Sequence, residues 1–180
     1  MEFSDVIKYR TSIRKYSNKE VEEDKIFYIL ECARLAPSAM NKQSWRFIVI
    51  KNKETITQIA KTNLINRWIK TAPVLIIACA DPTLSGSHNT IAYYIINVSI
   101  ALEHLILAAT DIGLGTCWIG SFNEKKIKRL LEIPKRIRVV ALTPLGYPLG
   151  TKGIVETITT ILLKSKKRKT LDEIVHYEHW

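Results

Sequence analysis

The chain has 180 residues and a formal net charge of +10, with 47% hydrophobic and 24% charged residues. This composition excludes a disordered chain and fits one globular domain over residues 1–180. The basic surplus favours anionic partners, namely phosphates, acidic proteins, nucleic acid or a membrane surface.

The sequence of the first half of the chain predicts helices and strands that alternate only loosely. Ser4 is a candidate N-cap for the first helix, and Pro37 ends the second, in which apolar residues recur at helical spacing. Residues 74–80 are a continuous apolar run, which is typical of a strand buried on both faces. We expect helices over residues 4–10, 21–36 and 53–62, and strands over 46–50 and 74–80.

The second half begins with the most apolar segment, residues 91–112, which is roughly long enough to span a bilayer. Polar residues including Asn97, Glu103 and Asp111 interrupt it, and no cluster of basic anchors flanks it. We therefore predict a buried central helix rather than a membrane span. After it we expect a strand over 116–119, a basic helix over 123–131, a strand over 139–145 and a short helix at Thr170, with Glu173 completing a capping box.

The three cysteines, Cys32, Cys79 and Cys117, are odd in number and widely spaced. This pattern argues against a disulfide framework and a cysteine-rich zinc site, and we expect reduced thiols and no metal. The first ten residues lack the apolar core of a secretory signal, so we expect a cytoplasmic protein.

Four short stretches are candidates for chemistry. In the first, residues 9–16, Arg10, Ser12 and Arg14 alternate and would share one side of an extended chain. Such a cluster can bind a phosphate and a polar ring edge. The alternative is a solvated basic loop.

The second stretch, residues 36–45, lies between a helix and a strand. Asn41 and Gln43 each offer a donor and an acceptor, as the edge of a heterocyclic ring requires. An ordinary loop of turn-forming residues is the alternative.

The third stretch, residues 113–120, carries glycines that let the backbone approach a planar ligand. A helix end followed by a strand explains it equally well, and the two interpretations are compatible. The fourth is the basic tail from Lys164, which could converge on the same phosphate or be a solvated face.

The motifs R-x-S-x-R, P-S-x-x-N-x-Q-x-W, G-L-G-T-C-W-I-G and K-x-R-K-x-L-D-E-I-V-H occur in this order and cover nearly the whole chain. Together they resemble the FMN-dependent nitroreductase family. The resemblance implies an α+β fold, with a central mixed or antiparallel sheet flanked by helices, and an intertwined homodimer with FMN at the subunit interface.

The resemblance also implies a set of cofactor-binding residues. The phosphate and ribityl chain would contact Arg10, Thr11 and Ser12, and Arg14 would reach the N1 and C2-carbonyl edge of the ring. A cation there stabilises the negative charge of reduced flavin. The partner subunit would supply Pro37, Ser38, Ala39 and Asn41, with Gln43 a weaker candidate. The remaining contacts would be Trp118, Ile119, Gly120, Lys166 and Arg168.

The implied reaction is ping-pong electron transfer from NADH or NADPH through flavin N5 to a small nitroaromatic or quinone acceptor. No catalytic side chain is expected, because the cofactor supplies the chemistry. Thr11 and Ser44 depart from residues frequent in the family.

Several alternatives remain open. One is other flavin chemistry on the same fold, and another is a non-catalytic FMN-binding redox protein. The basic helix 125–129 leaves open an acidic electron-donor protein such as a ferredoxin. Nucleic-acid binding is disfavoured, because no binding motif or aromatic interleaving accompanies the charge.

Overall fold

The computed structural model describes residues 1–149 and 168–180. Contacts divide the chain into two compact units, Met1–Pro148 and Leu149–Trp180, and each is described by itself.

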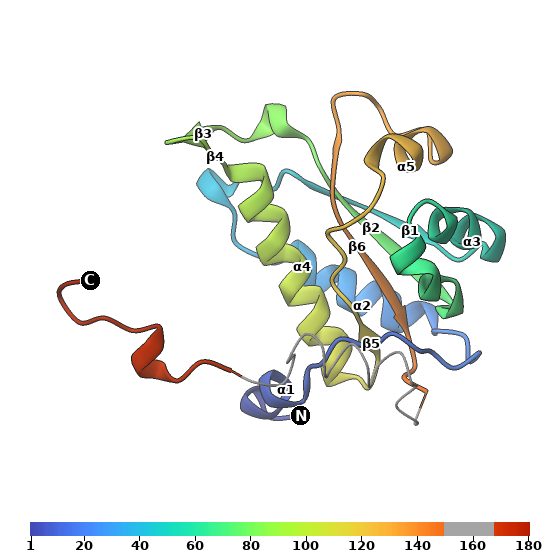
Figure 1. The fold of residues 1–180 in the computed structure, drawn as a ribbon, viewed down its shortest axis with the longest axis horizontal. Helices are drawn as coiled ribbons and strands as arrows, with labels where there is room; N and C mark the ends of the chain where they lie inside the picture. Colours follow the sequence, from blue (N-terminus) through green and yellow to red (C-terminus); the bar gives the residue numbers. More distant parts are fainter. Residues whose placement is uncertain (150–167) are drawn as a thin grey trace. The chain divides into compact units, whose positions relative to one another are not determined.

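The first unit is built on a four-stranded antiparallel sheet in the order β1-β2-β6-β5 (Figure 1). Ser12 adds an isolated parallel bridge to Thr116, so the sheet is mixed at that edge. This confirms the predicted α+β class and the central sheet. The strands are β1 (Trp45–Ile50), β2 (Val74–Ala80), β5 (Gly115–Thr116) and β6 (Arg138–Gly146).

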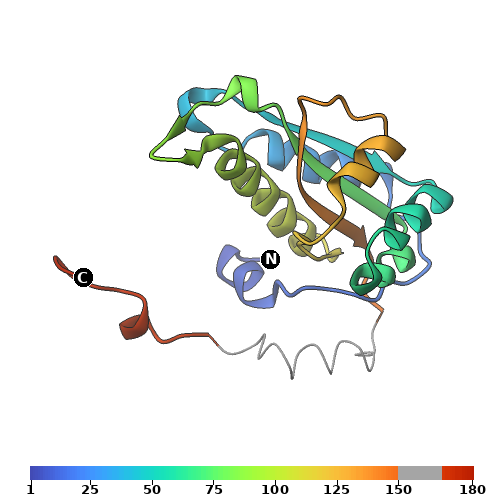
Figure 2. The same ribbon diagram turned by 45° about the horizontal axis from the view of Figure 1, so that its top comes forward.

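Helices cover both faces of this sheet (Figure 2). Along the central strand β2, Ile76 and Ala78 pack against a core that includes α2 and α4. The alternate residues Leu75 and Ile77 pack against a second core with α3 and α5. Because side chains alternate across a strand, a run buried on both faces must be apolar throughout. The helices are α1 (Phe3–Tyr9), α2 (Glu23–Arg34), α3 (Lys53–Lys61), α4 (Tyr93–Asp111) and α5 (Glu124–Leu130).

Short elements complete the described residues. The second unit contains the predicted short helix, where the Thr170 backbone N–H donates to the Glu173 carboxylate over 2.8 Å. The 3-10 turns are η1 (Ala39–Asn41), η2 (Leu64–Thr71), η3 (Pro82–Leu84) and η4 (Leu171–Glu173), and a hairpin joins β3 (Ser87–His88) to β4 (Ile91–Ala92).

Helix α4 is a core helix of the first unit. Eight of its residues are buried, among them Asn97, Leu102 and Leu105, and it packs against α2 and the sheet. Among the described residues it is the one helix long and apolar enough to cross a membrane. Packing within the core accounts for its buried positions, whereas Ile95 and Ile96 are exposed.

Helix α2 spans Glu23–Arg34 instead of residues 21–36, because Glu22 has an extended backbone and Leu35 is the C-cap. Three further predicted boundaries are wrong. Helix α1 begins at Phe3, because the N–H groups of Asp5 and Val6 already bond to the Glu2 carbonyl, so Ser4 is not the N-cap. Residues 91–92 pair in the hairpin, which delays α4 to Tyr93.

The third difference is β5, which ends at Thr116 instead of residue 119. The register of β5 against β6 places Cys117 opposite Pro144, which has no N–H to donate. The ladder resumes only at Ile119, which pairs with Leu142.

Candidate functional site

The segment that follows α1, residues 10–16, lies against β5; we call it the arginine segment. The Ile13 N–H donates to the Thr116 carbonyl over 2.8 Å, and the Tyr16 hydroxyl donates to the Ile13 carbonyl over 2.7 Å. A Cβ on Gly115 would lie 2.7 Å from Ile13 Cγ1. Glycine is therefore required at position 115 for the Ile13 side chain to pack this closely against the β5 backbone.

Side chains of the arginine segment gather beside Cys117. Arg10, Ser12 and Arg14 are half-buried, whereas Thr11 is exposed. Burial raises the pKa of the Cys117 thiol, while Arg14, a hydrogen bond with Ser12, and Arg10 lower it. The structure thus brings the first and third sequence motifs together.

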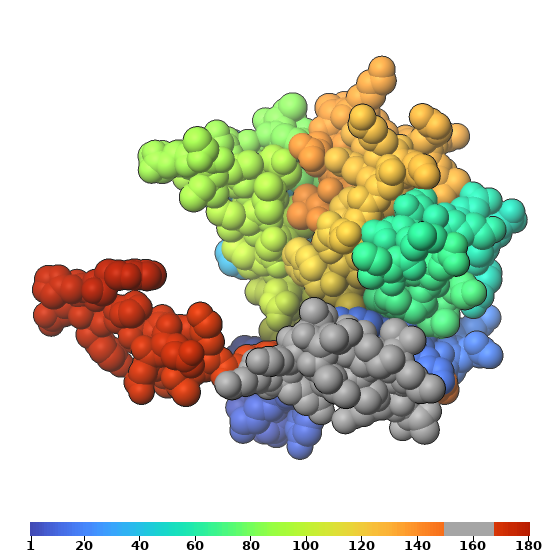
Figure 3. Space-filling model, in the orientation of Figure 1, coloured from blue at the N-terminus to red at the C-terminus, as the bar shows by residue number. Residues whose placement is uncertain are grey.

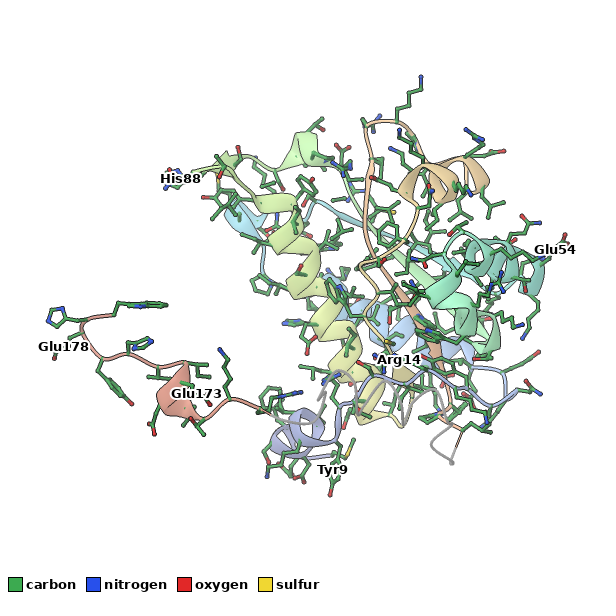
Figure 4. The ribbon with its side chains drawn as sticks, in the orientation of Figure 1. Tyr9, Arg14, Glu54, His88, Glu173 and Glu178 are labelled. Atoms are coloured by element: carbon green, nitrogen blue, oxygen red, sulfur yellow. The ribbon has the colours of Figure 1, made fainter. Side chains whose placement is uncertain are left out.

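The two arginines lack an acidic partner within the described residues, since no carboxylate oxygen lies within 4.0 Å of either guanidinium group. Half-buried cations without a counter-ion favour an anionic ligand. Figure 4 labels Arg14, near the C-terminal end of α4. The arrangement fits the phosphate and the electron-rich ring edge of FMN.

The end of the glycine motif borders an open pocket of about 340 Å³. Trp118 is 39% exposed, and Ile119 is buried and pairs with β6. Gly120 is exposed and lines the pocket together with Tyr94 and Arg138. Of this segment only Gly120 lines the pocket, because the N–H and carbonyl of Ile119 are both bonded to Leu142. The backbone at Gly120 therefore lies beside a space that a planar group could enter.

The second motif forms a separate structure, residues 36–44, which we call the proline–serine loop. Asn97 of α4 organises it: its Oδ1 accepts from the Ala39 N–H over 3.0 Å. Its Nδ2 donates to the hydroxyls of Ser44 over 3.2 Å and Ser85 over 3.0 Å. One buried amide therefore ties the loop to the start of α4 and to the segment before the β3–β4 hairpin.

Three residues of the proline–serine loop have positive φ: Met40 (52°), Asn41 (53°) and Gln43 (45°). Such conformations cost about 1–3 kcal/mol each for non-glycine residues and cluster at ligand sites. The Gln43 N–H donates to Ser38 Oγ over 2.9 Å, and Gln43 Nε2 donates to Asn41 Oδ1 over 3.0 Å. The two amides therefore form one exposed pair.

The proline–serine loop and the arginine segment lie at opposite ends of α4 (Figures 1 and 2). From Asn97 to Asp111 the helix rises about 20 Å, at 1.5 Å per residue. Within one protomer the structure therefore does not bring the predicted residues Pro37, Ser38, Ala39, Asn41 and Gln43 together with Arg10, Ser12 and Arg14.

Two further predicted residues belong to the tail. Arg168 is exposed and lies in the unit Leu149–Trp180. Lys166 lies outside the described residues.

Sequence reasoning missed the role of Asn97, which it took only as an interruption of an apolar helix. The available signal was the amide itself, because a polar side chain buried in such a helix must find hydrogen-bond partners. No cluster of three or more metal-ligating side chains occurs in the described part of the chain.

Comparisons with known proteins agree with these motifs. The chain matches the model of the nitroreductase family over residues 7–64 and 60–147. A protein of Methanothermobacter thermautotrophicus named as an NADH dehydrogenase/NAD(P)H nitroreductase is 36% identical over 157 residues, covering 85% of this chain and 81% of the relative.

Solved structures show the same fold. A nitroreductase family protein from Clostridium novyi NT matches with a TM-score of 0.80 and 43% identity, over 83% of this chain and 87% of that one. An FMN-dependent nitroreductase from Clostridium difficile R20291 matches with a TM-score of 0.79 and 29% identity, over 97% and 98% of the two chains.

Proposed function

Because the chain belongs to the nitroreductase family, we propose that it is an FMN-dependent oxidoreductase that takes electrons from NADH or NADPH and reduces nitroaromatic or quinone acceptors. The observation that carries this proposal is the pair of half-buried cations, Arg10 and Arg14, which have no carboxylate partner among residues 1–149 and 168–180 and lie beside Thr116 and Cys117. When bound, FMN supplies hydride chemistry at N5, so that the donor and the acceptor use one cleft in turn.

The side chains of the arginine segment bind and orient the cofactor in this proposal. Arg10, Thr11 and Ser12 hold the phosphate and ribityl chain. Arg14 faces the N1 and C2-carbonyl edge, where its charge favours the anionic reduced form. The effect is stronger in a half-buried site than in water, because the effective dielectric constant is lower. No side chain serves as an acid, base or nucleophile.

The proline–serine loop completes the site of a second copy in a homodimer. Its distance from the arginine segment of the same protomer and its left-handed residues support this role. Met40 is 87% exposed, and Phe3 and Phe27 are each 71% exposed, as expected of faces that a partner covers. Trp118, Ile119 and Gly120 would line the ring, and Lys166 and Arg168 would close on the phosphate.

The proposal places a single functional domain, residues 1–180, in the cytoplasm. The first experiment is the visible spectrum of the purified protein, followed by anaerobic addition of NADPH. A yellow protein that bleaches supports both cofactor and donor. A protein that stays oxidised with NADPH and with NADH contradicts the donor assignment, and one that is colourless and refuses added FMN contradicts the whole proposal.

A further inference from the structure

A dense group of cations covers α5 and the loop that leads to β6. Residues 124–138 hold seven lysines and arginines against two glutamates, Glu124 and Glu132. Figure 3 shows this part of the chain, in gold and orange, on one continuous face, and Figure 4 shows nitrogen-tipped side chains projecting from it. We call the exposed members the basic patch: Lys125, Lys126, Arg129, Lys135, Arg136 and Arg138.

Some of these cations have structural roles. Arg136 Nε lies 3.1 Å from Asp81 Oδ2, and Arg138 Nε lies 2.9 Å from Glu124 Oε1. Glu124 Oε1 also accepts from the Val139 N–H over 3.0 Å. These contacts fix the loop and the start of β6, so they make the patch a defined surface.

The other four cations have no such role. Lys125, Lys126, Arg129 and Lys135 are exposed, and within the described residues no carboxylate lies within 4.0 Å of their charged groups. Arg129, in the last turn of α5, interacts favourably with the helix dipole, but four like charges on a short helix and its loop also repel one another, which costs stability. A bound acidic surface would remove that cost.

The basic patch borders the open pocket that reaches the glycine motif. Arg138 and Glu124 line the pocket beside Gly120 and Tyr94. A partner docked on the patch would therefore approach the backbone segment that we propose to face the flavin ring.

We propose that the basic patch is the docking surface for an acidic one-electron carrier protein, of the iron–sulfur type, that can replace the nicotinamide as donor. This inference rests on the proposed function. Two reduced carriers each lose one electron, and a proton from water completes the equivalent of one hydride. The carriers are oxidised and the bound cofactor is reduced by two electrons, so the exchange balances.

The size and composition of the patch favour a carrier protein over nucleic acid. Electron-transfer encounters use small interfaces, below about 1,200 Å², and depend on charge for their association rate. Single-stranded nucleic acid needs a track of cations with aromatic platforms for its bases. The patch occupies one seven-residue helix and a loop, and no aromatic residue lies between Glu124 and Arg138.

The test uses the FMN-loaded full chain and a purified acidic bacterial ferredoxin as the probe. One variant carries Lys125→Glu, Lys126→Glu, Arg129→Glu and Lys135→Glu. A matched control carries the same charge change on the neighbouring α3 and η2: Lys53→Glu, Lys61→Glu, Arg67→Glu and Lys70→Glu, all exposed. Calorimetry measures ferredoxin affinity at low and high salt, and stopped-flow absorbance measures flavin reduction by reduced ferredoxin and by NADPH.

We expect the wild type to bind at low salt and to lose affinity as salt rises. The patch variant should lose at least about tenfold in affinity and in ferredoxin-driven reduction, and the control less than about threefold. Reduction by NADPH should be the same in all three proteins, which keeps this test separate from that of the proposed function. Equal losses in both variants, no binding by the wild type, or tighter binding of a short RNA to the patch would overturn the inference.

Discussion

The arginine segment and the proline–serine loop are both candidate halves of one site, yet they are held in different ways. Backbone hydrogen bonds and a close glycine contact hold the arginine segment on β5. The proline–serine loop has one backbone bond to a distant segment, from the Asp81 N–H to the Ser44 carbonyl, and its link to α4 is the side chain of one residue, Asn97. A segment held by backbone hydrogen bonds tolerates many substitutions of its side chains, whereas the link made by the buried Asn97 amide is lost when that one side chain is replaced. The difference predicts which substitutions destroy the fold and which remove only binding.

The largest effect is expected from Asn97→Ala. It leaves the Ala39 N–H and the hydroxyls of Ser44 and Ser85 without their partner, which should cost about 3 kcal/mol of unfolding free energy. Urea denaturation measures the loss, and amide exchange at Ala39 should accelerate. Ser99→Ala, at a half-buried position of the same helix, is the control. A near-neutral Asn97→Ala would show that the loop has another anchor.

A smaller loss is expected from Gly115→Ala, which tests the anchoring of the arginine segment. The new Cβ would lie 2.7 Å from Ile13 Cγ1 and 2.9 Å from Ile13 Cβ, so the segment must move, at a cost of about 2 kcal/mol. FMN affinity should fall with stability. Gly120→Ala is the stability control, because its Cβ would meet nothing closer than Trp118 Nε1 at 3.9 Å. Equal stability of the two variants would contradict the close approach.

Arg14→Gln should separate binding from folding. We expect FMN affinity to fall about tenfold or more, because a charge-assisted contact is lost. The unfolding free energy should change by less than about 0.5 kcal/mol, because the side chain has no carboxylate partner in the described residues. Fluorescence titration with FMN measures the affinity, with Lys15→Gln as the exposed neighbour control. Unchanged affinity would remove Arg14 from the site.

The smallest expected effect is a pH dependence of folding stability, which involves Glu22 near the C-terminal end of the arginine segment. The Ser17 N–H bonds to the Tyr147 carbonyl, and the Tyr147 hydroxyl donates to Glu22 over 2.6 Å. That hydrogen bond lowers the pKa of Glu22 from 4.5 to about 2. Because the folded pKa is depressed, the stabilisation is complete above pH 4.5 and disappears as the pH falls through about 2.

Glu22→Gln should therefore lower the urea midpoint slightly at pH 7, and the difference from wild type should vanish near pH 2. Lys19 Nζ also lies 3.2 Å from Glu22 Oε1, and salt screens this exposed ion pair, so the difference should also shrink at 1 M NaCl. Glu20→Gln, at an exposed position without an ion pair in the described residues, is the control. The proline–serine loop, held by an uncharged amide, should show no such pH dependence. A difference for Glu22→Gln that persists at low pH would point to packing instead of charge.

Much of this fold could be predicted from local pattern. The apolar run of β2 and the helical spacing in α2 reflect burial, which is a direct property of residue type. The end of β5 depends on Pro144, some thirty residues away, and no local pattern reveals which residues face each other. In the site, the motifs indicated ligand chemistry, but the separation of Asn41 from Arg14 by a helix length is visible only in three dimensions. The role of Asn97 likewise depends on partners distant in sequence.

The contact between Ile13 and Thr116 has a consequence for biosynthesis. The arginine segment is synthesised before β5, the strand on which it lies, and roughly a hundred residues separate the two. At 5–20 residues per second, the nascent chain waits about 5–20 s before this contact can form. A pairing of such long sequence separation forms slowly, because a large loop must close. Binding of FMN by Arg10 and Arg14 would then follow the formation of this contact. Chains that have not yet bound FMN would be the ones that chaperones and proteases recognise.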